Sequence, residues 1–103
     1  MSGGVKESDW KLFQKLLPQW QAQAMGRLCH EYQEILSDDS KPASERFRKL
    51  DGRIRKDRRM ACVECTLSRS TMNNVLHELL AEGAITLEDL DGMSEEFQER
   101  MKR

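Results

Sequence analysis

The chain has 103 residues, which suits one domain built from a few helices and is too short for two independent cores. Its 17 Lys and Arg against 18 Asp and Glu leave a net charge of −1. This balance excludes a protein that coats nucleic acid with a uniformly basic surface and a DNA mimic with a uniformly acidic one. No apolar run would span a membrane, no secretory signal is present, and three cysteines without an export signal favour a reducing compartment. We therefore expect a cytoplasmic protein with no membrane partner.

The first part of the chain predicts a leader and two helices. Residues 1–7 are expected to form a flexible leader, followed by a single helical domain over 8–103. Ser8 is a suitable N-cap for the first helix, whose apolar side chains recur at spacings of three and four. Pro18 has no N–H to donate, so this helix is predicted to end or kink there. Pro18 equally suits the first position of a second helix, which runs to about residue 36.

A third helix is predicted from Ser44 to about Arg59, after a run of turn formers, and it is strongly basic. From Lys41 to Arg59 there are nine basic and three acidic residues, a net charge of +6, and the rest of the chain carries −7. The candidate partner-binding residues are the basic ones that surround its narrow apolar stripe: Arg46, Arg48, Lys49, Arg53, Arg55, Lys56, Arg58 and Arg59. Such a helix can contact nucleic-acid phosphates or an acidic protein groove, or it can be solvated or paired with the acidic C-terminal third of its own chain.

The C-terminal third predicts one longer helix and two short helical turns. Ser68 or Ser70 is expected to cap a fourth helix that ends at Gly83. Thr86 to Leu90 has the pattern of a capping box and a short helix, and Ser94 caps the last one. The fold expected is an all-α single-domain bundle of four main helices with short C-terminal helical turns. Its predicted core is Trp10, Phe13, Leu17, Trp20, Leu28, Tyr32, Ile35, Phe47, Leu50, Ile54, Met72, Val75, Leu76, Leu79, Leu90 and Phe97.

The residues capable of chemistry do not form a recognisable site. Cys62 and Cys65 have the spacing of half a zinc ribbon, but the second Cys pair that such a site needs is missing. They are as well explained as two small apolar side chains between helices, and metal binding by them stays open. His30 and His77 have no nucleophile at a suggestive spacing, and the glycines form no phosphate-binding loop. We therefore predict no catalytic residue, no cofactor and no enzymatic activity.

The stretch from Leu67 to Thr86 resembles the recognition helix of winged helix-turn-helix repressors of the GntR type. It reads Ser-Arg-Ser-Thr-Met, a helix with paired leucines, and then Glu-Gly. The resemblance implies that base edges would be contacted from the first turns of the helix, by Arg69, Ser70, Asn73 and Asn74. The sequence departs from that family in its charged insertion before Ser68 and in lacking a wing after Thr86.

A second resemblance covers residues 9–101. Trp10-Lys-Leu-Phe, Leu17-Pro-x-Trp-Gln21, Lys41-Pro-x-Ser and Gly83-Ala-Ile-Thr are similar to a family of short, uncharacterised bacterial proteins often encoded near phage and mobile-element genes and sometimes mislabelled multidrug transporters. It implies a shared fold and supplies no activity or site. Our hypothesis is a small non-enzymatic regulatory protein of a phage or mobile element. It would bind an unknown protein or nucleic acid through its charged helix, one version being inhibition of a host defence complex.

The alternative hypothesis is a helix-turn-helix-like transcriptional regulator that reads DNA with residues 68–82. A DNA reader of this kind is expected to be dimeric, and the chain's six methionines and narrow third-helix stripe leave a homodimer open under either hypothesis.

Overall fold

The computed structural model describes residues 5–102, and within them the chain is entirely helical, with no strand. The helices are α1 (Glu7–Leu36), α2 (Ala43–Asp57), α3 (Met72–Ala81) and α4 (Glu95–Lys102), with short 3-10 helices η1 (Arg69–Thr71) and η2 (Leu87–Leu90). The predicted all-α fold is confirmed. The predicted leader falls partly on residues 1–4, which lie outside the described residues. Glu7 already belongs to α1, whose N-cap is Lys6 rather than the predicted Ser8.

The prediction that Pro18 separates two helices is wrong, because α1 continues through it as one helix of 30 residues. Pro18 is exposed, whereas Leu17 and Trp20 beside it are buried. Pro18 has no N–H, so one backbone carbonyl in the preceding turn lacks its helical hydrogen bond, and on this exposed face it can turn towards solvent. Packing on the opposite face holds both halves of the helix in line. This long helix sets the shape of the molecule, whose extents are 56 × 23 × 22 Å.

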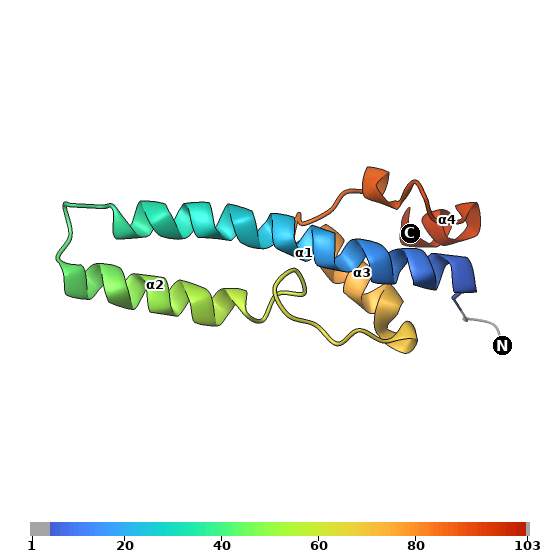
Figure 1. Ribbon diagram of the computed structural model, residues 1–103, viewed down its shortest axis with the longest axis horizontal. Coiled ribbons are helices and arrows are strands. Elements are labelled where there is room, and N and C mark those ends of the chain that lie inside the picture. Colours follow the sequence, from blue (N-terminus) through green and yellow to red (C-terminus); the bar gives the residue numbers. More distant parts are fainter. Residues whose placement is uncertain (1–4, 103) are drawn as a thin grey trace.

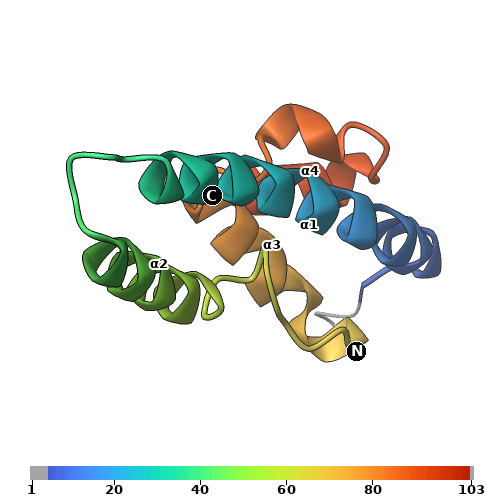
Figure 2. The same ribbon diagram turned by 60° about the vertical axis from the view of Figure 1, so that its left-hand side comes forward.

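The molecule has two parts along α1 (Figure 1). At one end, the first half of α1 packs with α3, η2, α4 and the segment after α2, and we call this the core end. At the other end, residues 25–57 form a helical hairpin in which α2 runs antiparallel to the second half of α1. Figure 2 shows from a second direction that α2 lies beside that half of α1, away from α4. The basic helix is therefore not packed against the chain's acidic C-terminal segment, and among residues 5–102 no ion pair joins the two.

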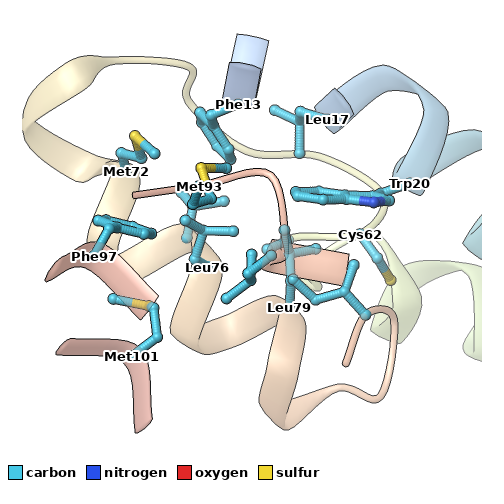
Figure 3. Packing of buried hydrophobic residues seen from close by; sticks show 14 of the residues in the cluster. Phe13, Leu17, Trp20, Cys62, Met72, Leu76, Leu79, Met93, Phe97 and Met101 are labelled. Atoms are coloured by element: carbon cyan, nitrogen blue, oxygen red, sulfur yellow. The ribbon is translucent and has the colours of Figure 1, made fainter. Parts of the chain in front are cut away.

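The buried apolar cluster belongs to the core end (Figure 3). Phe13, Met72, Leu76, Leu79 and Leu90 are almost fully buried in it. Side chains outside the predicted core list join them: Ala24, Ala61, Cys62, Ile85, Met93 and Met101. Burial of each large apolar side chain contributes about 1.5–3 kcal/mol, and it is the main force that holds α1, α3 and α4 together.

The core prediction is only partly correct in the hairpin, where Ile35 is buried as predicted but most of the other residues are not. Phe47 is 71% exposed rather than buried, and Leu28, Leu50 and Ile54 are only half-buried. Tyr32 is half-buried as well, and so is Trp10 at the core end. For the hairpin the reason is geometric, since α2 has one helix to pack against, and two helices alone cannot enclose a stripe from all sides.

Turn and cap predictions in the C-terminal third are largely correct. Gly83 adopts φ +75° just after α3, the left-handed conformation expected of a helix stop. Thr86 and Asp89 form the capping box of η2, and the Ser94 hydroxyl accepts the Phe97 N–H at the start of α4. Ser68 caps η1 by accepting the Thr71 N–H. At α2, however, the N-cap is Pro42 rather than Ser44, and the helix ends at Asp57.

Candidate interaction surface

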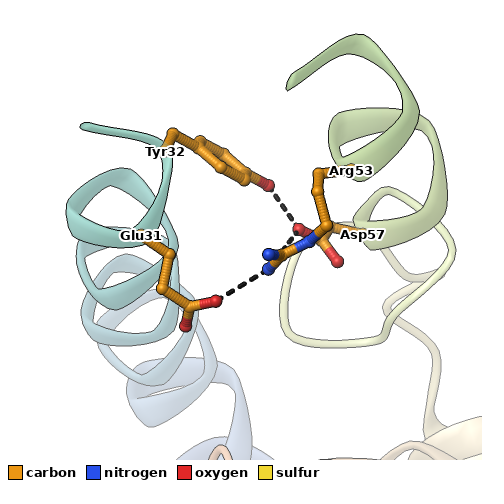
Figure 4. Close-up of polar contacts among 4 residues, drawn as sticks. All are labelled: Glu31, Tyr32, Arg53 and Asp57. Atoms are coloured by element: carbon orange, nitrogen blue, oxygen red, sulfur yellow. Dashed lines mark hydrogen bonds and ion pairs between the residues drawn. The ribbon is translucent and has the colours of Figure 1, made fainter. Parts of the chain in front are cut away.

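The hairpin joins α1 to α2 mainly by polar contacts (Figure 4). The Tyr32 hydroxyl donates to Asp57 Oδ2 at 2.5 Å, and Arg53 forms ion pairs with Glu31 at 2.7 Å and Asp57 at 3.5 Å. Arg53 also lies over the Tyr32 ring, with its guanidinium carbon 5.8 Å from the ring centre. Asp57, the one buried residue of α2, thus has both a hydroxyl donor and a cation beside it.

This cluster changes the acidity of the phenol. Burial, the hydrogen bond to Asp57 and the negative charge of that carboxylate together raise the pKa of Tyr32 from 10 to about 12. The neutral phenol is therefore kept as a hydrogen-bond donor at all ordinary pH values. In the same cluster, the hydrogen bond from Arg53 to Glu31 raises the pKa of the guanidinium, which remains charged.

Two of the eight predicted partner-binding residues are used inside the hairpin. Arg53 belongs to the cluster just described, and Arg46 donates to the Leu36 carbonyl at 2.7 Å, next to the connection between the helices. Arg55 pairs with Asp51 one turn earlier on α2, at 3.1 Å, but is itself largely exposed. The remaining five are exposed and form no ion pair within residues 5–102: Arg48, Lys49, Lys56, Arg58 and Arg59. With Arg55 they form what we call the basic face.

The charges of α2 are also arranged favourably along the helix. Glu45 lies in its first turn and Arg55 and Lys56 in its last, where they complement the helix dipole. The basic face is thus compatible with a stable helix and does not depend on a partner to neutralise it.

An apolar groove lies beside the basic face, between α1 and α2. Its volume is about 200 Å³, and its lining residues are Met25, Leu28, Cys29, Tyr32, Ile54, Asp57, Arg58 and Val63. A second, wider hollow adjoins it, lined by Arg55, Arg58, Arg59, Glu64, Cys65 and Thr66. Arg58 lines both, so an apolar surface and a cationic one meet at this residue.

The sequence pattern did not predict this groove. On a helical wheel Phe47 and Ile54 lie about 60° and 40° from Leu50, both on the same side of the stripe. The apolar stripe of α2 is therefore not centred on the side that faces α1 but extends to one side of it. This offset is the feature of the sequence that could have indicated the groove. Apolar spacing alone predicts a core here, because it assigns every apolar residue to the same interior.

The candidate DNA-reading residues are less available than the basic face. Arg69 forms an ion pair with Glu7 and lies over the Trp10 ring at 5.8 Å, so its guanidinium is held against the start of α1. Asn73 is half-buried. Arg69, Ser70 and Asn74 are exposed, and of these Arg69 is held in contacts within the same molecule.

The two neighbouring cysteines lie at the joint between the hairpin and the core end. Cys62 is buried, its N–H donates to Glu82, and burial followed by the nearby Glu82 carboxylate raises its thiol pKa to about 11. Burial also raises the pKa of Cys65, whose sulfur accepts a hydrogen bond from Gln21 at 3.6 Å. Within the described part of the chain, no three His, Cys, Asp or Glu side chains are close enough to hold a metal ion.

Comparison with protein-family models, with curated proteins and with solved structures found no match to this chain. None of the helices in residues 5–102 combines the length and apolar character needed to cross a membrane.

Proposed function

We propose that this chain is a non-enzymatic interaction protein that binds an anionic macromolecular partner through the basic face of α2. The observation that carries the proposal is the separation of the molecule into two parts. The core end holds the buried apolar cluster, whereas the hairpin projects from it with one buried residue on α2 and an exposed cationic surface. A helix of this kind contributes little to the core, and its charge is available for a partner.

The alternative, a DNA-reading regulator that uses residues 68–82, receives less support. Its central side chain, Arg69, is engaged by Glu7 and Trp10 within the same molecule. A reading helix needs such side chains free to form bidentate contacts with base edges. Freeing Arg69 would cost the ion pair and the stacking contact at the start of α1.

The biological setting that we propose follows from the family resemblance, namely a phage or mobile element whose small protein regulates or inhibits a larger host complex. In that setting the partner is either a protein with an acidic surface or the nucleic acid that the complex carries. Both would be attracted to the basic face, and both attractions would weaken with salt.

The test is a charge reversal on the basic face, read out by recovery of partners from lysate of the native host. The variant is Arg48→Glu, Lys56→Glu and Arg59→Glu combined, since these three exposed residues form no ion pair in residues 5–102. The matched control carries the same charge change at the core end, Lys6→Glu, Lys11→Glu and Lys15→Glu, which are exposed too. Each protein is used as bait with and without nuclease.

We expect a specific partner to be recovered with the wild type and the control but lost with the α2 variant. Recovery of the same partners by all three baits would contradict the proposal. The nuclease arm then tells whether the partner is held directly or by way of nucleic acid. Duplex binding that is lost on Arg69→Ala but retained by the α2 variant would favour the alternative.

A further inference from the structure

The apolar groove of the hairpin is continuous with exposed apolar side chains beyond it. Met25 is 38% exposed at one end of the groove, and Leu36 is 46% exposed at the end of α1. Phe47 follows Arg46, whose guanidinium donates to the Leu36 carbonyl and so sets the register of the two helices at this end. From Met25 to Leu36 the stripe follows α1 for about 16 Å, or three helical turns.

This length and shape suit a helix better than an extended chain or a flat surface. A helix laid along the groove would present apolar side chains at i, i+3 or i+4, and i+7, one for each turn of α1. Phe47, at 71% exposed, would cover the end of such a helix. A phosphate backbone has no apolar side chains and would leave this surface uncovered.

The charges around the groove favour an acidic occupant. On the α2 side its edge carries Arg58, with Arg55 and Arg59 in the adjoining hollow, where Glu64 is the one acidic residue. Asp57 also lines the groove, but it is buried and already paired with Arg53 and the Tyr32 hydroxyl. On the α1 side the next positions around the helix are Ala22, Gly26 and Gln33, all uncharged and exposed. A second copy of this chain laid on the groove would bring the same arginine edge against itself, which is unfavourable.

The chain's own acidic segment is not the occupant. Leu90 of η2 and Phe97 and Met101 of α4 are buried in the core end, which keeps that segment away from the hairpin. An acidic amphipathic helix must therefore come from another protein.

We propose that the apolar groove is a docking site for an acidic amphipathic helix of a partner protein, with its apolar side chains between Met25 and Ile54 and its carboxylates on Arg55, Arg58 and Arg59. The inference rests on the proposed function and narrows its partner to a protein. It also adds a second requirement, since binding must depend on the apolar groove as well as on the basic face.

The first experiment is selection from a phage-displayed library of helical peptides, with the full chain as bait. We expect enrichment of peptides with Leu, Ile, Met or Phe at helical spacing and Asp or Glu on the flanks. Two baits serve as matched negatives, Cys29→Glu, which places a charge on an exposed groove residue, and Arg58→Glu, which reverses the rim. Selected peptides are expected to bind either variant at least tenfold more weakly than the wild type.

The second experiment blocks the groove chemically. The experiment uses a chain with Cys65→Ser, because Cys65 is half-buried in the adjoining hollow. In that chain Cys29 is exposed on the groove and Cys62 is buried, so a maleimide should modify Cys29 first. We expect modification to abolish binding of the selected peptide, and we expect a Cys29→Ser chain treated in the same way to keep its affinity. Far-ultraviolet circular dichroism before and after modification establishes that the fold is retained.

Several results would overturn the inference. The inference is wrong if the selected peptides are basic or lack the apolar spacing. It is also wrong if they bind the Cys29→Glu variant with the same affinity as the wild type. A homodimer that dissociates on Phe47→Ser would show that a second copy occupies the groove. If the host partner lost by the Arg48/Lys56/Arg59 variant is a nucleic acid, the proposed function stands and this inference is wrong.

Discussion

At the scale of single residues, one buried carboxylate joins the two ends of the chain. Asp9 is 3% exposed, and it accepts the Ser94 N–H at 2.8 Å and the Ser94 hydroxyl at 2.7 Å, across 85 positions of sequence. Ser94 also caps α4, so the cap and the tertiary contact share one side chain. Asp9 therefore fixes where α4 meets the start of α1.

We predict that Asp9→Ala lowers the free energy of unfolding by about 2–3 kcal/mol, because it removes charge-assisted hydrogen bonds and leaves the half-buried donors of Ser94 unpaired. Urea denaturation monitored by tryptophan fluorescence measures it. Asp39→Ala, at an exposed turn position, is the matched control and should change stability by less than about 0.5 kcal/mol. If Asp9→Ala loses no more unfolding free energy than the control, the contact between Asp9 and Ser94 does not stabilise the fold.

The second prediction concerns the raised pKa of Tyr32, the chain's one tyrosine. Because the phenol keeps its proton more tightly when folded, the Tyr32–Asp57 bond stabilises the protein fully below pH 10, and that stability is lost as pH rises from about 10 to 12. Titration of the tyrosinate absorbance should give a midpoint near 12, moved towards 10 in Asp57→Asn. A wild-type midpoint near 10 would mean that the cluster does not form in solution.

At the scale of elements, tertiary packing keeps α1 continuous even though the local sequence preference at Pro18 is for a break. A proline inside a helix costs about 3 kcal/mol relative to alanine, yet α1 continues across Pro18. Phe13 and Leu17 before it and Trp20 and Ala24 after it are all buried in one cluster. A break at Pro18 would separate those two groups and lose more apolar burial than the proline costs.

Pro18→Ala is therefore expected to stabilise the protein, by up to about 3 kcal/mol, since it restores a helical hydrogen bond without touching the core. The midpoint of thermal unfolding should rise. Gln19→Ala, at the exposed neighbouring position, should change it far less. An unchanged or lower midpoint for Pro18→Ala would contradict the view that Pro18 costs α1 stability.

At the scale of the whole molecule, the folded protein is more elongated than a compact domain with the same number of residues. Its radius of gyration is 16.9 Å, whereas about 13 Å is usual for 103 residues. The excess comes from the hairpin, where α2 buries one residue, and that residue is a carboxylate. Such an element has little apolar burial of its own and should open more easily than the core end.

Native-state hydrogen exchange tests this difference. Amides of α2 are expected to exchange by local opening, at rates insensitive to low denaturant, while those of α3 and the first half of α1 exchange only on global unfolding. A partner bound on the hairpin should slow exchange in α2 in particular. Uniform protection of α2 and α3 would mean that the hairpin folds as one unit with the core end.

Much of the local structure follows from the sequence, because it depends on neighbours. The stop at Gly83, the capping box of Thr86 and Asp89 and the cap at Ser94 each need only a few adjacent residues, and each is present. The all-α class follows in the same way from apolar spacing. The concentration of positive charge on α2 likewise follows from the order of residues along the chain alone.

What the sequence left undecided was how far each apolar stripe would be covered, since that depends on how many elements pack against it. Phe13 and Phe47 both sit on apolar stripes, yet one is fully buried and the other is 71% exposed. Phe13 meets α3 and the C-terminal helices, whereas Phe47 lies on a helix with a single neighbour. The tertiary structure alone decided that difference, because burial is a property of the assembled layers and not of the helix that carries the side chain.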